Sequence, residues 1–130
     1  MSPVKVSHSA YQGEIAHWLR SLRHGGKTLP ECAIHTRKGT KVADVGWVSA
    51  LRFEQIKQET ECSIAPEICV EVLSDSNTRE EIQETQALYF ERGAEEVWIC
   101  NTKGAITFFD PQGKLTQSQL VPTFPQYIEL

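Results

Sequence analysis

The segment between residues 68 and 101 constrains the fold of this chain most strongly. It contains an apolar run at 68–74, a polar stretch that ends at Gly93, and a second apolar run at 96–101. Runs rich in valine and isoleucine are typical of buried strands, and the stretch between them is long enough for a helix. Because a strand, a helix and a strand in this order form a crossover connection, the two strands are expected to run parallel.

Two helices are predicted from the spacing of apolar residues and from the signals at their ends. The first covers 9–24, with Ser7 or Ser9 as the residue that caps its N-terminus. The second follows Ser76 or Asn77, either of which is a suitable cap, and carries two glutamates in its first turn. Both segments place apolar residues on one side, so we expect each helix to lie on a face of the sheet.

Two further pairs of strands are predicted as hairpins. The runs 31–36 and 41–49 are joined by a short turn that contains a glycine, and 105–110 follows 96–101 across a Lys-Gly turn. Residues 50–65 are equally compatible with a short helix and with a loop. The predicted order of elements is α-β-β-β-α-β-β, which makes an α/β fold with a mixed sheet flanked by helices.

Length and composition indicate a single domain over 1–130, because 40% of the residues are hydrophobic and no linker or repeat interrupts them. The chain has no apolar run of about 18 residues and no leader-like block near its start, which predicts a soluble cytoplasmic protein without a membrane segment. We expect the widely spaced cysteines to be reduced core thiols rather than disulfides or a zinc site. There are four of them: Cys32, Cys62, Cys69 and Cys100.

Charge is unevenly distributed along the chain, whose formal net charge is −4. Residues 1–52 hold eight basic and three acidic side chains, whereas 53–100 hold three basic and twelve acidic ones. A general nucleic-acid coat protein is basic throughout, so this class is not favoured. The pattern is still compatible with a local basic surface in the first half.

Two acidic residues interrupt apolar strands. Glu71 lies between two valines, and Asp44 lies between an alanine and a valine. Burying a carboxylate is costly unless it has a partner, so each needs a reason. One explanation is structural, with each side chain bonded to backbone N–H groups or to a basic residue. The other is that the two acids jointly hold a divalent cation such as magnesium, as in the sites of phosphodiester hydrolases.

The segments "VADVGWVS", "PEICVEVLS", "ALYFERGAEEVWIC" and "MSPVKVSHSAYQGEIA" resemble the restriction endonuclease-like family of the PD-(D/E)XK nuclease superfamily. The resemblance covers nearly the whole chain and keeps the order and spacing of these motifs. It implies a mixed sheet with flanking helices, a cytoplasmic location and cleavage of DNA that depends on Mg²⁺, with Mn²⁺ as a substitute. It also implies that Asp44 and Glu71 are the metal ligands.

The chain departs from the family pattern at the catalytic lysine. The superfamily places this lysine two residues after the glutamate, where this chain has Leu73, and in this branch it has migrated into the following helix, to the position of Thr85. Threonine carries no charge, and Gln83 is a neighbouring polar residue able only to position a water. Lys41 and Lys103 are the two lysines that could replace the catalytic lysine if the fold brings either of them to the site. The chain is therefore expected to be either an endonuclease of impaired activity or an inactive module that binds DNA or protein.

Three further expectations concern partners and additional site residues. Family members usually carry an N-terminal segment ahead of the Met-Ser-Pro, and its absence predicts a short form with an open sheet edge and a homodimer. Glu14 is a candidate third carboxylate at the metal site. Basic residues in the first hairpin are candidates for contacts with DNA phosphates, although a solvated basic turn explains them equally well. They are Arg37, Lys38 and Lys41.

Overall fold

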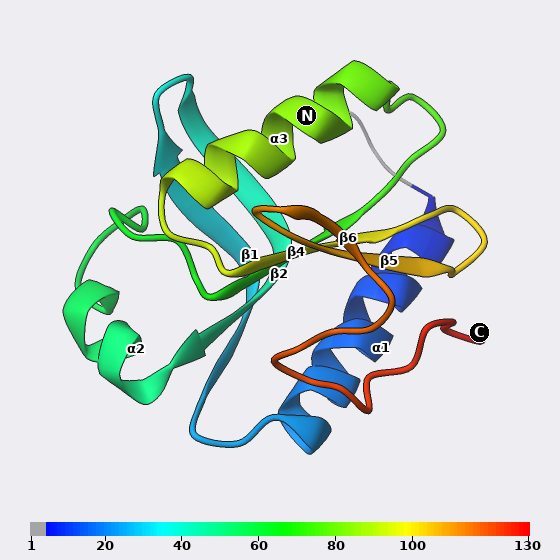
Figure 1. The fold of residues 1–130 in the computed structure, drawn as a ribbon, viewed down its shortest axis with the longest axis horizontal. Coiled ribbons are helices and arrows are strands. Elements are labelled where there is room, and N and C mark those ends of the chain that lie inside the picture. The colour runs from blue at the N-terminus through cyan, green and yellow to red at the C-terminus, as the bar shows by residue number, and fades with distance from the viewer. Residues whose placement is uncertain (1–4) are drawn as a thin grey trace.

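The computed structural model describes residues 5–130 and shows three helices around one six-stranded sheet (Figure 1). The elements, in chain order, are α1 (Val6–Leu22), β1 (Gly26–Thr36), β2 (Gly39–Ser49), α2 (Ala50–Ile56), β3 (Ile68–Val72), α3 (Arg79–Glu91), β4 (Glu96–Cys100), β5 (Ile106–Asp110) and β6 (Gly113–Leu115). Within residues 5–130, no helix is long and apolar enough to cross a membrane.

The strands follow one another in the sheet in chain order, from β1 to β6. Only β3 and β4 are parallel, and α3 connects them, which confirms the crossover predicted from the sequence. All other neighbouring pairs are antiparallel. The mixed α/β sheet is therefore confirmed, with two additions to the predicted order: the ambiguous segment forms the short helix α2, and a short strand β6 follows β5.

The first helix begins earlier than predicted. Its N-cap is Lys5, which makes no side-chain capping bond, whereas Ser7 and Ser9 lie inside the helix, so the predicted caps were wrong. Tertiary contacts explain the extra turn. Lys5 forms an ion pair with Asp75 at 2.8 Å, and His8 bonds to the backbone at the end of β3, so packing outweighs the local capping preference.

The cap of α3 also differs from the prediction. Thr78, rather than Ser76 or Asn77, caps the helix, and its Oγ1 accepts a hydrogen bond from the Glu81 backbone N–H at 3.1 Å. The Asn77 side chain is already used in the preceding turn, where its Oδ1 accepts from the Ser74 N–H at 2.7 Å. The Asn77 side chain therefore bonds within the turn before the helix and is not available to cap α3.

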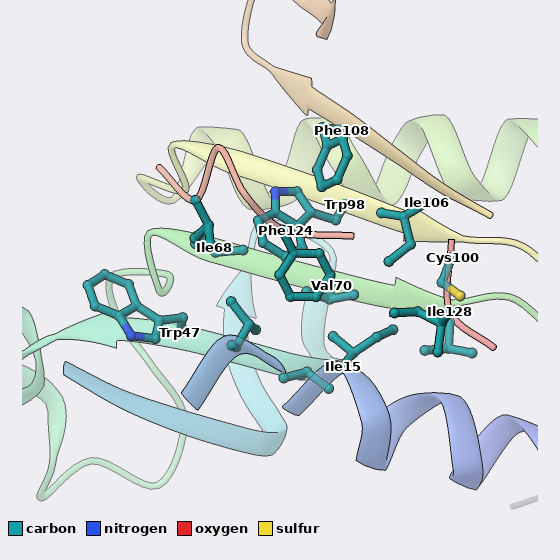
Figure 2. Packing of buried hydrophobic residues seen from close by; sticks show 14 of the residues in the cluster. Ile15, Trp47, Ile68, Val70, Trp98, Cys100, Ile106, Phe108, Phe124 and Ile128 are labelled. Atoms are coloured by element: carbon teal, nitrogen blue, oxygen red, sulfur yellow. The ribbon is translucent and has the colours of Figure 1, made fainter. Parts of the chain in front are cut away.

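Apolar side chains pack on both faces of the sheet. On one face α1 and the C-terminal segment cover a cluster that Figure 2 shows from close by, in which the Trp98 ring lies 5.0 Å from Phe108 and 4.5 Å from Phe124 between centroids. On the other face α2 and α3 cover a second cluster that includes Cys69, Tyr89 and Val97. Figure 1 shows α1 and α3 on opposite sides of the sheet. Residues that alternate along β3 and β4 therefore face different helices.

A buried carboxylate attaches the C-terminal segment to the sheet. Glu96 is 1% exposed, and its oxygens accept hydrogen bonds from Trp98 Nε1 (2.8 Å), Ser118 Oγ (2.6 Å), and the backbone N–H groups of Gln119 (2.8 Å) and Leu120 (3.0 Å). Four donors compensate for the loss of hydration, so this acid has a structural role.

Glu67, on the same side of β3 as Glu71, is likewise structural. Its Oε1 accepts from the Ser49 N–H at 3.0 Å, and its Oε2 lies 3.6 Å from Arg52 Nε. The Arg52 guanidinium also donates to two backbone carbonyl oxygens, at 2.8 and 3.0 Å. Glu67 therefore fixes α2 to the sheet at a distance from the candidate metal ligands.

Candidate active site

Asp44 lies where β2 and β3 separate. The two strands pair through Trp47 with Ile68, Gly46 with Cys69, and Val45 with Val70, and the pairing then stops. Continued pairing would place Asp44 opposite Glu71. Instead, Asp44 Oδ2 accepts a hydrogen bond from the Val72 backbone N–H at 2.7 Å. The carboxylate thus supplies the acceptor that the departing strand no longer offers, which explains an acid in the middle of a strand.

The neighbouring strand is irregular at the same level. The β1–β2 register runs from Pro30 with Val45 directly to Cys32 with Ala43, and the intervening Glu31 has a φ of 51°. This left-handed conformation is uncommon for residues other than glycine. The Glu31 charge contributes to raising the pKa of both site acids, Asp44 and Glu71. A third carboxylate that the sequence did not suggest therefore influences the pair.

Glu71 faces α3, where the buried Tyr89 donates a hydrogen bond to Glu71 Oε1 at 2.5 Å. The pKa of Glu71 is raised to about 8, first because burial disfavours the charged form and second because Asp44 is negatively charged nearby. The bond from Tyr89 opposes this rise but does not cancel it. Near neutral pH a large fraction of the Glu71 carboxyl therefore holds a proton in the protein without a cation.

Asp44 is the more acidic member of the pair. Burial raises the pKa of Asp44, whereas the Val72 N–H and the neighbouring His8 lower it. The proximity of the two carboxyls lowers the pKa of Asp44 and raises that of Glu71, which is the direction expected when Glu71 is the member that keeps a proton. His8 Nε2 lies 3.5 Å from Asp44 Oδ2 and donates to the Val72 carbonyl oxygen at 3.0 Å. His8 therefore connects α1 to the site.

The two carboxylates fit a hard divalent cation. They offer oxygen ligands from adjacent strands, and a cation in place of the Glu71 proton would relieve the repulsion between them. The predicted third ligand is not brought to them, because Glu14 lies on the exposed side of α1. Among residues 5–130 no group of three or more His, Cys, Asp and Glu side chains is arranged to hold a metal. Further ligands of a bound cation would be water and substrate.

A cavity of about 210 Å³ opens between the separated strands and α3. Glu71 and Thr85 both line it, so the position of the expected lysine does face the site. Gln83 does not line this cavity, because it precedes Thr85 by two residues and therefore points about 200° away from it around the axis of α3. It lines a different hollow, between α3 and β5. The polar or charged residues that line the cavity are Lys41, Glu71, Asn77, Glu81, Thr85 and Tyr89.

The basic residues of the first hairpin differ in their partners. Arg37 Nε lies 3.0 Å from a Glu91 carboxylate oxygen, and Lys38 Nζ lies 2.6 Å from Glu84 Oε2, so α3 neutralises both cations. Lys41 has no carboxylate oxygen within 4.0 Å of its ammonium in the described part of the chain, residues 5–130. The candidate phosphate contacts therefore separate into two paired cations on the surface and one unpaired cation at the cavity.

Comparison with known proteins identifies the family of this chain. A model of the Uma2 family, described as a putative restriction endonuclease, matches residues 1–130. The chain belongs to this family. The resemblance seen in the sequence motifs is thereby confirmed. A comparison with curated protein sequences finds no match for this Uma2-family chain.

Solved structures share the fold of this Uma2-family chain. One is a putative nuclease belonging to DUF820 from Anabaena variabilis, at a TM-score of 0.70 and 17% identity over 85% of this chain and 66% of that chain. Another is the DrdV–DNA complex, at a TM-score of 0.54 and 13% identity over 83% of this chain and 9% of that chain. The chain thus spans slightly less than two thirds of the first protein and a small part of the second.

Three residues at the site were not selected from the sequence. Tyr89 belongs to the "ALYFERG" motif, and its place on the apolar side of the helix that follows the Glu71 strand is the sequence signal for a partner of this acid. His8 was within a motif but had no assigned role. The role of Glu31 was not predicted, because it depends on the local backbone irregularity that leaves Glu31 unpaired opposite Asp44 within a continuous β1–β2 register.

Proposed function

We propose that this protein is a divalent-metal-dependent endonuclease that hydrolyses phosphodiester bonds in DNA. The observation that carries the proposal is the carboxylate pair Asp44 and Glu71, placed where β2 and β3 separate, of which Glu71 lines an open cavity. Membership of a family described as putative restriction endonucleases supports it, as does the fold shared with a protein solved in complex with DNA.

Asp44 and Glu71 would hold Mg²⁺, with Mn²⁺ as a substitute, since both metals prefer carboxylate oxygens. When bound, the metal would supply a charge that neutralises the phosphate and a lowered pKa for bound water. The Val72 N–H fixes Asp44 and the Tyr89 hydroxyl fixes Glu71, so both carboxylates are held before substrate arrives. Because Glu71 must lose its proton to act as a ligand, metal affinity rises with pH.

Lys41 is the residue best placed to contribute a positive charge to the reaction. It pairs with Ile34 across β1 and β2, and paired residues of an antiparallel ladder point to the same face. Ile34 belongs to the cluster under α2 and α3, the face that also carries Glu71 and Tyr89. We assign Lys41 to the phosphate oxygens at the cavity, in the role that Thr85 cannot perform.

Arg37 and Lys38 would act outside the cavity. Each is paired with a carboxylate of α3, so each would contact a DNA phosphate by exchanging that partner. Such contacts position DNA without reading its sequence and weaken steeply as salt increases.

A homodimer would use the free edge of the sheet. β1 is an edge strand of 11 residues, and apart from β2 its only bridge in the described chain is between Ile34 and Cys62. The Cys62 bridge occupies the outer edge of β1 around Ile34, and the part of β1 before Cys32 is an open edge that offers a template for pairing with a second chain. Light scattering after gel filtration distinguishes a dimer from a monomer, and a monomer at all concentrations would remove this part of the proposal.

A second candidate function is that of an inactive nuclease-fold module that binds DNA or protein. The threonine at position 85 favours this second function, because α3 supplies no lysine to the cavity and Lys41 is the one cation among the residues that line it. In this case the protein would bind DNA or a protein partner without cutting DNA.

Nicking of supercoiled plasmid tests the enzymatic proposal. The wild type is expected to nick DNA in Mg²⁺ or Mn²⁺ and not in a chelator. Asp44→Asn and Glu71→Gln should lower the rate by about 10²-fold or more. Glu14→Gln is the matched control, an exposed carboxylate that should be dispensable. An active Asp44→Asn protein would contradict the proposal, and an inert wild type that binds DNA would favour the second function.

A paired substitution tests Lys41. Lys41→Ala should lower the nicking rate by about 10²-fold, and adding Thr85→Lys to Lys41→Ala should restore it, because the new lysine enters the same cavity. Lys38→Ala is the control for a general loss of positive charge in the hairpin. If Lys41→Ala cuts DNA like the wild type, Lys41 has no part in the reaction even though the protein is a nuclease.

A further inference from the structure

Two cysteine thiols lie in contact on the side of the sheet covered by α2. Cys32, on β1, and Cys62, in the segment between α2 and β3, have their Sγ atoms 3.5 Å apart. The other two cysteines have different partners: Cys69 Sγ donates to the Pro66 carbonyl oxygen at 3.5 Å, and Cys100 Sγ donates to that of Asn101 at 3.6 Å. The chain therefore contains one thiol pair and two separate thiols.

The backbone holds this pair in place. Cys62 forms a parallel bridge with Ile34, in which the Cys62 N–H donates to the Ala33 carbonyl oxygen at 2.8 Å and the His35 N–H donates to the Cys62 carbonyl oxygen at 2.9 Å. The adjacent Glu61 carboxylate lies 2.8 Å from His35 Nδ1 and accepts from the Thr40 hydroxyl. These contacts attach the α2–β3 segment to the outer edge of β1, so the short distance between the sulfurs is supported on both sides.

Small oxidants have access to this pair before the other thiols. A cavity of about 250 Å³ is lined by both Cys32 and Cys62, which are 6% and 8% exposed. Cys69 and Cys100 are each 0% exposed. The bond between the paired thiols lowers the pKa of Cys62 and raises that of Cys32. Because the thiolate is the reactive form, Cys62 is the sulfur that would react first.

We propose that Cys32 and Cys62 are a modification site, at which a peroxide-class oxidant forms a reversible disulfide between β1 and the α2–β3 segment. In the first step the Cys62 thiolate attacks one peroxide oxygen, the O–O bond breaks, and a sulfenic acid forms with release of water after protonation. In the second step the Cys32 sulfur attacks Cys62 Sγ, the S–O bond breaks, and a second water leaves with the Cys32 proton. The two thiols lose two electrons in total, and hydrogen peroxide is reduced to two waters.

The cross-link would join positions 30 residues apart, with α2 between them. Restricting a loop of this size in the unfolded chain stabilises the folded state, provided that the sulfurs approach to about 2 Å without strain. The bond would also anchor the part of β1 that directly follows Glu31, which neighbours the carboxylate pair. The inference does not depend on the nuclease proposal, since it concerns thiol chemistry alone.

Titration of the folded, reduced protein with hydrogen peroxide tests the site. Thiol counting under denaturing conditions should fall from four to two, the intact mass should decrease by two hydrogens, and peptide mapping should locate the bond between Cys32 and Cys62. Dithiothreitol should restore all four thiols. The melting temperature of the oxidised form should rise by several degrees, on the order of 5–10 °C.

Two variants make the result specific. Cys62→Ser should prevent the cross-link, whereas Cys100→Ser, the matched loss of a buried thiol, should form it at the wild-type rate. Mapping on the wild type answers the question even if a variant fails to fold. Four free thiols after peroxide treatment of the folded protein, or a bond mapped to any other pair, would overturn the proposal.

Discussion

The stability of the Glu71→Gln variant should differ from that of the wild type in a way that depends strongly on pH. The pKa of Glu71 is about 8 in the folded protein, against an ordinary value of 4.5. The folded state therefore binds this proton more tightly than the unfolded state. Its contribution to stability is fully present below pH 4.5 and is lost as the pH rises towards 8. Glutamine has no such proton to lose and keeps a carbonyl oxygen for the bond from Tyr89.

The magnitude follows from the difference between the two pKa values. At about 1.4 kcal/mol for each pH unit, the full interval corresponds to on the order of 5 kcal/mol at pH 8 and above. Because Glu71 borders an open cavity, solvent screening reduces this, and we expect Glu71→Gln to be more stable than the wild type by about 2–3 kcal/mol at pH 8. The two proteins should be nearly equal at pH 4.5.

Urea unfolding at pH 5, 7 and 8.5 in a chelator provides the assay. The control is Glu80→Gln, the same substitution at an exposed position in the first turn of α3, which should show little dependence on pH. Added Mg²⁺ should stabilise the wild type more than Glu71→Gln, because only the wild type retains both carboxylates. A constant difference between wild type and variant across this pH range would refute the proposed protonation of Glu71.

Three other predictions address single contacts. Tyr89→Phe removes the bond that partly opposes the raised pKa of Glu71, so the midpoint for metal binding, followed by titration calorimetry, should move to higher pH; an unchanged midpoint would contradict this. Glu96→Gln should cost about 2–3 kcal/mol of unfolding free energy in urea, since an amide NH₂ would face buried donors, and a neutral effect would show that the network adapts. Thr78→Ala should cost about 1 kcal/mol through loss of the α3 cap while Thr78→Ser costs less, and equal losses would argue against capping.

Much of this fold follows from local patterns in the sequence. The apolar runs at β3 and β4 and the amphipathic helix between them predicted a parallel pair, and the glycine turn at residue 39 predicted the first hairpin. The family motifs selected Asp44 and Glu71, the acids that the structure places next to each other. Such features are readable because burial on one face imposes a period on the residues of each element.

The predictions that were wrong, or not made, depend on contacts between distant segments. The cap of α1 changed because Lys5 and His8 bond to residues near the end of β3, whereas the cap of α3 changed because the Asn77 side chain is used in the turn before the helix. Gln83 and Thr85 were both plausible at the site, and only the packing of α3 on the sheet turned Thr85 into the cavity and Gln83 away from it. Sequence spacing alone does not give the rotation of a helix about its axis relative to a partner.

The sequence by itself determined the alternation of strands and helices and the presence of two acids that are costly to bury. Tertiary structure decided what those acids do. The separation of β2 from β3 leaves the Val72 N–H for Asp44, and α3 brings Tyr89 to Glu71. It also decided which cations are neutralised, since α3 pairs with Arg37 and Lys38. The reason is physical: hydrophobic period is a local property, whereas charge, pKa and hydrogen bonding depend on neighbours that only folding supplies.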